Sequence, residues 1–407
     1  MSAPAPPPLE TPTHTESEIL VRDFLSSHPE LDKDLGEIEV MTDRYTNEEW
    51  AAQIRETQRK VLGKSSGVEE GLVRKFECPK VGSREFAETI DHTVLKLDAT
   101  AGQIDALCSE ARTEGFKSVC VRLNYVSRCV SNLKGSPVVV ACVVGFHEGT
   151  QDTYNKLREA RAAVAAGASE LDVVLNHSIL TAKNNATGGD KSHRPQLSES
   201  TIESLTASNT LANSKPRTGA LTPAEGPYSK PEPSPIPRSP ISQTAGDPIP
   251  DYSTIYRELA SIRSLCPSPT VLKLILETSQ LDAQQIVAAA HLAAAANFDF
   301  IKTSTGFNGP GAKLPDVQLM VAAAEHLSTK TKSNGGSPVR GSKMQVKASG
   351  GIRSLEDAIT MLEAGATRLG TSSGLWIMQE SRRAKQDGEQ ARPAATRLYT
   401  DDSVGGY

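Results

Sequence analysis

The sequence alternates short β-rich runs with alanine-rich amphipathic stretches, apart from polar segments near its ends and middle. Eight runs predict strands, over residues 91–95, 118–123, 138–145, 170–176, 271–277, 298–304, 344–350 and 367–373. Apolar residues at i, i+3 and i+4 predict helices over 103–113, 153–168, 282–296, 316–327 and 354–366. This alternation favours an α/β protein with a (β/α)8 TIM barrel. An open dinucleotide-binding sheet fits less well, because no G-x-G-x-x-G follows the first strand.

Three segments have a different composition from the barrel pattern. Residues 1–80 predict an N-terminal extension, disordered over the Pro/Ala/Thr-rich first 16 residues and then helical over 17–31 and 47–63. We expect Ser17 and Asn47 to be the N-caps of these two helices. Between the fourth and fifth strands, residues 182–250 are rich in Ser, Pro, Asn and Gly, which predicts a disordered insertion. The barrel domain is expected over 81–381, followed by a flexible tail over 382–407.

Composition and charge exclude several classes of protein. The net charge is −5, with basic and acidic residues interspersed, whereas a nucleic-acid binder would carry a basic stripe. No stretch reaches the roughly 18 apolar residues of a membrane span, and the N-terminus lacks the features of a signal peptide. The six cysteines include no C-x-x-C pair and lie mostly in apolar runs, which indicates buried thiols. We therefore expect a cytoplasmic protein that binds neither nucleic acid nor membrane.

Charged residues inside apolar strands mark the candidate site, because barrel enzymes place their active sites at the C-terminal ends of the strands. Four such residues occur: Asp172, Lys273, Lys302 and Lys347. A buried lysine is costly unless it is paired or neutral, so three of them in neighbouring strands indicate function. The alternative is a structural ion pair, which for Lys273 would involve Asp172 or Glu277.

Lys302 and Lys347 fall on neighbouring predicted strands, whose backbones lie about 4.8 Å apart. Two ammonium groups roughly 5 to 6 Å apart repel by about 3 kcal/mol at an effective dielectric near 20. One of them should therefore be neutral near pH 7, and a neutral buried amine can attack a carbonyl and form an iminium. Asp172 could carry protons to and from this intermediate, directly or through a water molecule.

The loops after the last three predicted strands read STGFNGPGA, SGGIRS and GTSSG. Small residues let backbone N–H groups approach an anion, and barrels often bind phosphate after strands seven and eight. Each loop taken alone could equally be a tight turn. The three loops together with Arg353 favour a phosphate site.

Five segments resemble the signature segments of the deoxyribose-phosphate aldolase family: IDHTVLKLDAT, ELDVVLN, FIKTSTGF, VKASGGIRSLEDA and RLGTSSG. The resemblance covers residues 85–180 and 252–375. It implies that Lys302 forms the Schiff base, that Lys347 tunes it and that Asp172 transfers protons. The reaction implied is reversible cleavage of 2-deoxy-D-ribose 5-phosphate to acetaldehyde and D-glyceraldehyde 3-phosphate, without a metal or other cofactor. The partners implied are therefore a sugar phosphate and small aldehydes, with a homodimer as the assembly.

The same resemblance assigns supporting roles to further residues. Asp91 matches a position that supports the catalytic lysines, with Lys273 as another supporting residue, and Cys120 matches a cysteine near the substrate. For Cys120, a core thiol is the role that we favour. The phosphate-contacting set is Gly306, Gly350, Gly351, Arg353, Gly370, Ser372 and Ser373. Two rival functions are another Schiff-base barrel aldolase with a different aldehyde donor, and a catalytically idle scaffold that binds partners through the insertion.

Three further sequence features could indicate a function, but for each we favour an interpretation without one. His147 and Glu148 could suggest a metal, but no second His follows at i+4. Thr222, Ser234 and Ser239 precede prolines as in sites for proline-directed kinases, although unselected linkers contain many such pairs. Tyr407 ends the chain behind two glycines and could carry protons at the barrel mouth, but we favour a flexible tail without a role in the site.

Overall fold

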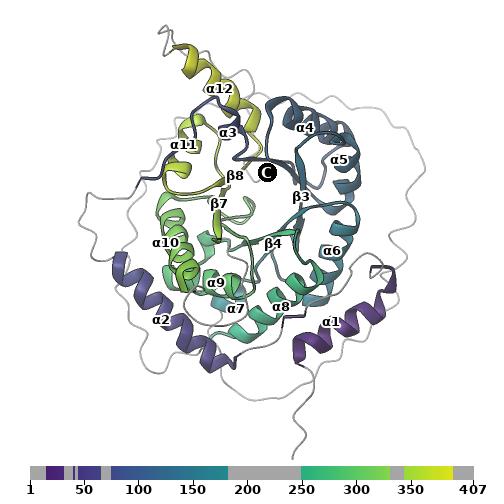
Figure 1. Ribbon diagram of the computed structural model, residues 1–407, viewed down its shortest axis with the longest axis vertical. Coiled ribbons are helices and arrows are strands. Elements are labelled where there is room, and N and C mark those ends of the chain that lie inside the picture. Colours follow the sequence, from purple (N-terminus) through teal and green to yellow (C-terminus); the bar gives the residue numbers. More distant parts are fainter. Residues whose placement is uncertain are drawn as a thin grey trace, which may run out of the picture. The chain divides into compact units, whose positions relative to one another are not determined.

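A closed barrel of eight parallel strands forms the centre of the protein, in the order β1 to β8 (Figure 1). The computed structural model describes residues 15–31, 40–41, 45–65, 75–181, 249–330 and 343–387. The strands are β1 (Ile90–Thr93), β2 (Ser118–Val121), β3 (Val139–Val144), β4 (Glu170–Val174), β5 (Val271–Ile275), β6 (Phe300–Lys302), β7 (Gln345–Ser349) and β8 (Arg368–Thr371). All eight predicted strands are confirmed. Each is shorter than predicted, because residues at one or both ends of each run lie outside the ladder.

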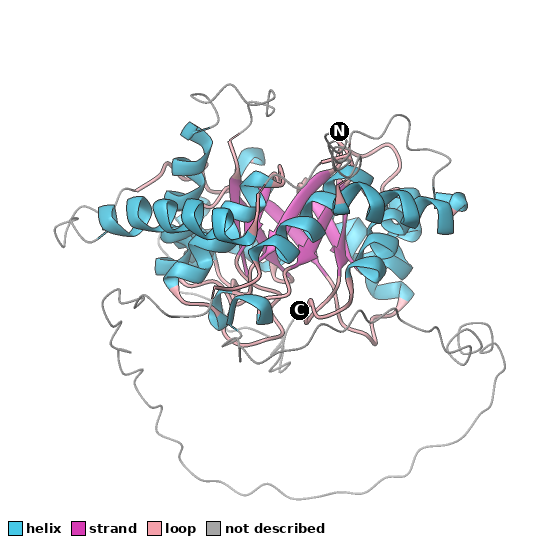
Figure 2. Ribbon diagram, turned by 90° about the horizontal axis from the view of Figure 1, so that it is seen from below, coloured by secondary structure: helices cyan, strands magenta, loops and turns pink. Residues whose placement is uncertain are grey.

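Helices surround the strands, as the view across the barrel shows (Figure 2). The five predicted helices are α4 (Ala101–Glu114), α6 (Thr153–Ala165), α9 (Ala283–Ala295), α10 (Leu314–Lys330) and α11 (Leu355–Glu363). Capping boxes begin several of them: Thr100 with Gln103 opens α4, and Asp282 with Gln285 opens α9. The described residues contain others that periodicity did not single out, namely α3 (Arg84–Ala87), α5 (Val126–Asn132), α7 (Ser178–Thr181), α8 (Tyr252–Leu265) and α12 (Gly374–Asp387).

The two sides of each strand have different surroundings. On β4, Leu171 and Val173 belong to the large apolar core under the helices, whereas Asp172 between them is fully buried inside the barrel. The ladder places Asp172 opposite Lys273, and Lys302 opposite Lys347. Strand register thus brings charged residues from distant parts of the sequence to one level of the barrel interior.

The extension forms two helices, α1 (Glu16–Ser27) and α2 (Asn47–Ser65), but the predicted N-caps are wrong. The Thr15 hydroxyl caps α1 by accepting a hydrogen bond from the Glu18 amide, while Glu18 accepts one from the Thr15 amide. Ser17 is buried within the first turn. The same exchange joins Thr46 and Glu49 at the start of α2. In both cases a Thr-x-x-Glu capping box satisfies two backbone donors, whereas a lone Ser or Asn satisfies one.

Both extension helices pack on the outer helices of the barrel, α1 beside α8 and α2 beside α9 and α10 (Figure 1). Val21 and Phe24 of α1 and Trp50 and Ile54 of α2 belong to the same apolar core as the barrel helices. The Trp50 ring lies 4.7 Å from that of Tyr256 on α8. The extension therefore completes the core on this side of the barrel.

Asn47 bonds to the start of α8 instead of its own helix, and adds to the N-cap of α8, Asp251, which accepts from the Thr254 amide. Its Oδ1 accepts hydrogen bonds from the amides of Tyr252, at 2.8 Å, and Ser253, at 3.3 Å. Its Nδ2 donates to the Pro250 carbonyl at 3.1 Å. Since the first amides of a helix have no partner within the helix, the extension supplies what α8 lacks. Asn47 thereby fixes the segment through which the chain returns to the barrel after residue 248.

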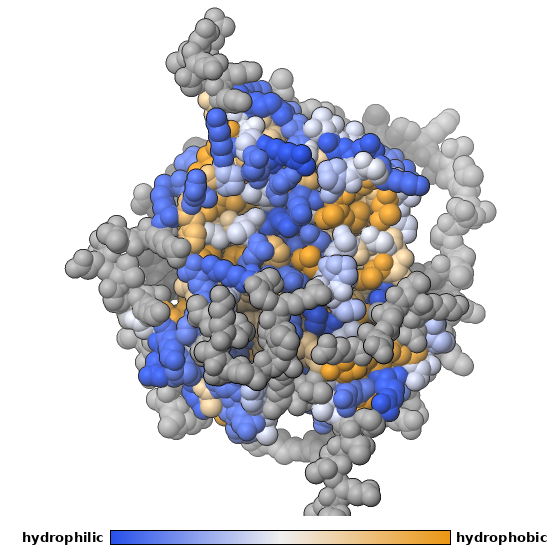
Figure 3. Space-filling view, in the orientation of Figure 1, coloured by the Kyte–Doolittle hydropathy of each residue, from blue (hydrophilic) through white to orange (hydrophobic). Residues whose placement is uncertain are grey.

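Several sequence-based expectations lie outside the described residues: the insertion over 182–248, the tail after residue 387 with Tyr407, and the candidate phosphorylation sites Thr222, Ser234 and Ser239. Within the described ranges, no helix is both long and apolar enough to span a membrane. Where residues are described, hydrophilic and hydrophobic side chains are interspersed over the face drawn in Figure 3.

The role of Asn47 can be tested with the variant Asn47→Ala. It removes three hydrogen bonds to the start of α8, so we expect the free energy of unfolding to fall by about 1–3 kcal/mol, measured by urea denaturation. Asn47→Asp keeps the oxygen acceptor and loses only the bond to Pro250, so it should lose less. An unchanged urea midpoint in Asn47→Ala would show that the clamp contributes no stability.

Candidate active site

A network of buried charges fills the barrel interior. Each member is at most 7% exposed. The cations are Lys273, Lys302, Lys347 and Arg368, and the carboxylates are Asp91, Glu170 and Asp172. Buried charges are tolerated only when they are paired and hydrogen-bonded, and here every member has at least one partner of opposite sign.

Asp172 is the centre of the network and contacts three lysines. Its Oδ2 accepts hydrogen bonds from Lys302 Nζ at 2.9 Å and from Lys347 Nζ at 2.8 Å. Its Oδ1 accepts from Lys273 Nζ at 2.7 Å. Burial opposes the charge on Asp172, but the three lysines hold its pKa well below the usual range. Asp172 is therefore a carboxylate at neutral pH, able to accept a proton.

Two further carboxylates hold the outer members of the network. Asp91 accepts from Lys347 Nζ at 2.5 Å and from Arg368 Nη1 at 2.6 Å. Glu170 lies 2.6 Å from Lys273 Nζ and 3.2 Å from Arg368 Nη1. Lys273 thus makes the structural ion pair with Asp172 that the sequence left as an alternative. Glu277, the other partner considered, is bonded to Thr305 instead.

The network holds four cations against three carboxylates, so one positive charge is in excess. Among the three lysines of the network, Lys302 is the one whose pKa is lowered. Burial, and secondarily the charge on Lys347, lower its pKa below the usual range, although Asp172 opposes them. For Lys347, burial is outweighed by Asp172 and Asp91, which raise its pKa. The geometry therefore makes Lys302 the best candidate for a neutral amine.

The Cys120 side chain lies in the apolar part of the barrel interior. It forms a small cluster with Leu95, Ala141 and Val143, and Phe146 and Phe307 pack against this cluster. Its Sγ is 4.0 Å from Asp172 Oδ2. Burial raises the pKa of the thiol to about 11. Cys120 is thus a protonated thiol that lines the site beside Asp172, as both sequence-based readings allow.

Two of the expected phosphate-loop glycines, Gly350 and Gly370, are needed for close packing. Gly350 has a left-handed backbone with φ of 87°, and a Cβ there would lie 2.7 Å from the Cα of Gly311 in the β6–α10 loop and 3.5 Å from that of Gly306. A Cβ on Gly370 would lie 2.9 Å from Lys347 Cε. Gly370 therefore makes room for the lysine itself, a role that the sequence did not indicate.

The other residues of the expected phosphate set lie at the ends of β7 and β8. Gly351 has φ of 76° and open space where a side chain would be, and it is exposed. Arg353 is also exposed, and its amide bonds to Asp357. Ser372 and Ser373 directly precede α12, and the Ser373 amide bonds to Thr371 Oγ1. Their places at strand ends and at a helix N-terminus suit an anion.

Two members of the charge network, Glu170 and Arg368, were not predicted from the sequence. A signal was available, because residues two apart on a strand face the same side. Glu170 stands two residues before Asp172, and Arg368 two before Gly370. We did not predict either residue as part of the site, because both stand at the start of a strand, where charged residues usually face solvent.

His147, weighed as a metal ligand, belongs to an aromatic contact. Its ring stacks on that of Phe307 at 5.2 Å. In the parts of the chain that the structure describes, no group of three or more His, Cys, Asp or Glu residues could hold a metal ion.

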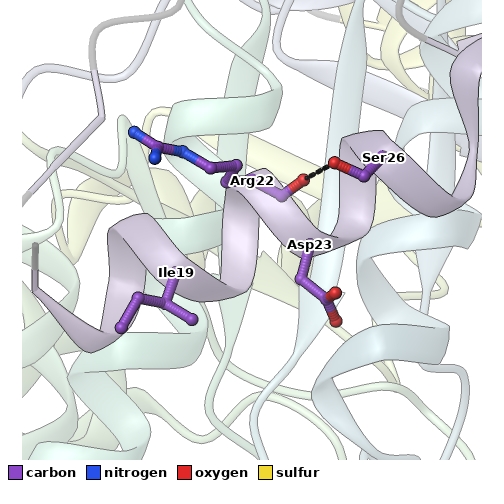
Figure 4. A pocket seen from close by; sticks show the side chains of 4 residues that line it. All are labelled: Ile19, Arg22, Asp23 and Ser26. Carbon is purple, nitrogen blue, oxygen red and sulfur yellow. Dashed lines mark hydrogen bonds between the residues drawn. The ribbon is translucent and has the colours of Figure 1, made fainter.

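Two surface hollows of about 260 Å³ lie outside the barrel interior. One lies on α1, lined by Ile19, Arg22, Asp23 and Ser26, where the Ser26 hydroxyl bonds to the Arg22 carbonyl (Figure 4). The other lies between β1 and α4, around the His92–Glu110 pair. Neither contains a residue of the charge network.

Comparison with known proteins agrees with this geometry. Residues 86–194 and 253–380, more than half of the chain, match the DeoC/LacD family of aldolases. A deoxyribose-phosphate aldolase of Coccidioides immitis is 38% identical over 307 residues, covering 75% of this chain and 84% of that protein. The chain belongs to the DeoC/LacD aldolase family.

Other family members extend the agreement. A deoxyribose-phosphate aldolase of Caldicellulosiruptor saccharolyticus is 34% identical, covering 73% of this chain and 98% of its own. A crystal structure from Coccidioides immitis superposes with a TM-score of 0.58 at 35% identity, covering 84% of this chain and all of that one. A deoxyribose phosphate aldolase structure from Aeropyrum pernix, 24% identical with a TM-score of 0.52, supports the fold alone.

The tuning of Lys302 by Lys347 can be tested with Lys347→Met. Both ammonium nitrogens lie within 3 Å of Asp172 Oδ2, hence within about 6 Å of each other. Removing Lys347 removes a repulsion of about 3 kcal/mol, or roughly two pKa units, and balances the network at three cations and three carboxylates. The pKa of Lys302 should rise, so the acid limb of the kcat/KM profile for aldol cleavage should move to higher pH.

Lys343→Met is the control for this prediction, because Lys343 is an exposed lysine bonded to Glu325 just before β7. Its profile should match that of the unaltered protein. An acid limb that stays in place in Lys347→Met would contradict electrostatic tuning by Lys347.

Proposed function

We propose that the protein is a deoxyribose-phosphate aldolase, a metal-independent lyase of the Schiff-base class. It would cleave 2-deoxy-D-ribose 5-phosphate reversibly to acetaldehyde and D-glyceraldehyde 3-phosphate, in the catabolism of deoxyribose phosphates. The observation that carries the proposal is the contact of Lys302 and Lys347 with a single oxygen of Asp172 inside a family-typical barrel. This arrangement provides a nucleophile, a residue that tunes it and a base.

The reaction would begin with neutral Lys302, whose amine attacks the C1 aldehyde of the open-chain sugar phosphate. The resulting carbinolamine loses water and becomes an iminium. Asp172, a carboxylate, then accepts the proton of the C3 hydroxyl, directly or through water. The C2–C3 bond breaks, its electron pair enters the iminium to give an enamine, and glyceraldehyde 3-phosphate leaves. Protonation of C2 and hydrolysis release acetaldehyde and restore Lys302.

Lys347 and its supports would act on Lys302 rather than on the substrate. Asp91 accepts a hydrogen bond from Lys347 Nζ and is itself held by Arg368. Lys273 donates a hydrogen bond to the second oxygen of Asp172. The oxygen of Asp172 shared by Lys302 and Lys347 is then the one free to exchange a proton once Lys302 has bonded to the substrate.

Borohydride trapping tests the nucleophile. Reduction in the presence of 2-deoxy-D-ribose 5-phosphate should fix an adduct on Lys302, located by peptide mass mapping, and acetaldehyde should be released in the untrapped reaction. Lys302→Arg should remove the adduct and lower kcat by at least about a thousandfold, because a guanidinium remains protonated. Lys343→Arg is the matched control. An adduct on another lysine would refute the assignment, and release of a different aldehyde would identify another Schiff-base aldolase.

The loops at the ends of β6, β7 and β8 would hold the phosphate. The proposed contacts are Gly306, Gly350, Gly351, Arg353, Ser372 and Ser373, with Gly370 beside them. Support comes from Gly350 and Gly306, which lie close together, and from the N-terminus of α12 at Ser373, where the helix dipole favours an anion. The phosphate would then anchor the sugar with C1 directed toward Lys302.

Ser373→Asp tests the phosphate site by placing a negative charge at the start of α12. Repulsion should raise KM for 2-deoxy-D-ribose 5-phosphate by at least about tenfold, since two charges near a protein surface interact by a few kcal/mol. The unphosphorylated sugar should be cleaved with unchanged kcat/KM. Ser373→Ala removes only the hydroxyl and should have a smaller effect. Equal losses for both sugars in Ser373→Asp would place the phosphate elsewhere.

Further parts of the proposal come from the sequence and the resemblance. These are a homodimer, a cytoplasmic location, an extension over residues 1–80, a barrel domain over 81–381 and a tail over 382–407. For the location, support comes from the six free cysteines, five of them buried. For the domains, support comes from the eight strands, all of which lie within 81–381.

A further inference from the structure

Glu277 is a buried carboxylate near Lys302 that the mechanism does not use. It is 1% exposed and follows β5 with a left-handed backbone, φ 58° and ψ 61°, which is uncommon for a residue other than glycine. Its Oε2 accepts hydrogen bonds from Thr305 Oγ1 at 2.5 Å and from the Thr305 amide at 3.2 Å. A strained backbone and a buried carboxylate are both costly, so their combination points to a role beyond packing.

Thr305 connects Glu277 to an aromatic residue. Thr305 lies three residues after Lys302, and its Oγ1 accepts a hydrogen bond from the Phe307 amide at 3.1 Å. A hydroxyl has one hydrogen to donate, and here that hydrogen is directed to Glu277. The three residues therefore form a relay that fixes the backbone between Lys302 and Phe307.

The Phe307 ring is one part of an aromatic wall, which we define as Phe146, His147 and Phe307. The Phe307 ring stacks on His147 at 5.2 Å and meets the Phe146 ring edge-on at 5.1 Å. Asn308, the next residue, donates from Nδ2 to the His147 carbonyl at 3.0 Å. The relay and this bond hold the β6 side of the wall against the loop that follows β3.

The wall covers the apolar part of the site. Phe146 and Phe307 pack against the cluster that contains Cys120, and Cys120 Sγ lies 4.0 Å from the oxygen of Asp172 that Lys302 contacts. A short apolar group attached to Lys302 Nζ would therefore have this cluster close by. The position of the Phe307 ring against this cluster would then set how long that group can be.

We propose that Glu277 is a positioning residue that acts through Thr305 on Phe307 and thereby restricts the donor aldehyde to two carbons. The inference rests on the proposed function, because it concerns the donor that would be bound to Lys302. Glu277 touches neither the donor nor Lys302 in this role. Its effect is on the choice between donors, while the chemical step depends on Lys302 and Asp172.

The relay can be broken at Thr305 without changing its volume. Thr305→Val removes the hydroxyl, whereas Thr305→Ser keeps it and is the matched control. With D-glyceraldehyde 3-phosphate as acceptor, we expect the ratio of kcat/KM for acetaldehyde to that for propanal to fall at least about tenfold in Thr305→Val. Thr305→Ser should retain most of the selectivity. Glu277→Ala should lose as much as Thr305→Val, and the double variant no more than either, because they act in one relay.

A second measurement does not depend on catalysis. Hydrogen–deuterium exchange of the peptide that contains the Thr305 and Phe307 amides should accelerate at least about tenfold in Thr305→Val and Glu277→Ala, and little in Thr305→Ser. Unchanged exchange in the folded variants would overturn the relay, and faster exchange with unchanged donor selectivity would overturn its role in specificity. If the unaltered protein releases no acetaldehyde, the proposed function is refuted. The exchange data test the relay independently of that result.

Discussion

The carboxylate of Asp172, held in the barrel interior by three lysines, is the interaction on which the site depends. An isolated carboxylate there would be protonated, and isolated lysines there would be neutral. Asp172 and the lysines bonded to it stabilise one another's charged forms, so no member can be understood alone. The excess of one positive charge makes the arrangement reactive, because it leaves Lys302 with an incompletely compensated proton.

The barrel supplies the geometry that this network needs. Parallel pairing between β4 and β5 places Asp172 opposite Lys273, and pairing between β6 and β7 places Lys302 opposite Lys347. A shift of one residue in either register would turn a charged side chain toward the apolar helices. The buried charges and the strand register therefore stabilise the same structure, and the outer core of aliphatic residues holds it rigid.

Much of the fold and the centre of the site could be predicted from the sequence. Strand runs and helical periodicity are local signals, and a lysine such as Lys302 within an apolar run can be recognised without a structure.

Long-range contacts were harder to predict. Asn47 has the right chemistry for an N-cap, but its oxygen accepts from the first amides of a helix more than two hundred residues away, whose own N-cap is Asp251. Gly370 looked like part of a phosphate loop, and only the packed structure shows that Ser349 and Lys347 occupy the place where its side chain would be. Glu277 stood in a predicted strand, with nothing nearby in sequence to indicate Thr305 as its partner.

The clamp made by Asn47 also constrains the order in which the protein can be assembled on the ribosome. Residue 47 is synthesised long before Pro250, its partner 203 positions later. Until α8 and α9 emerge, Trp50 and Ile54 have no surface to cover, so the apolar side of α2 stays open to water or to a chaperone. The first part of the chain to be made would thus be among the last to find its place. The extension could dock only after the helices of the second half of the barrel had formed.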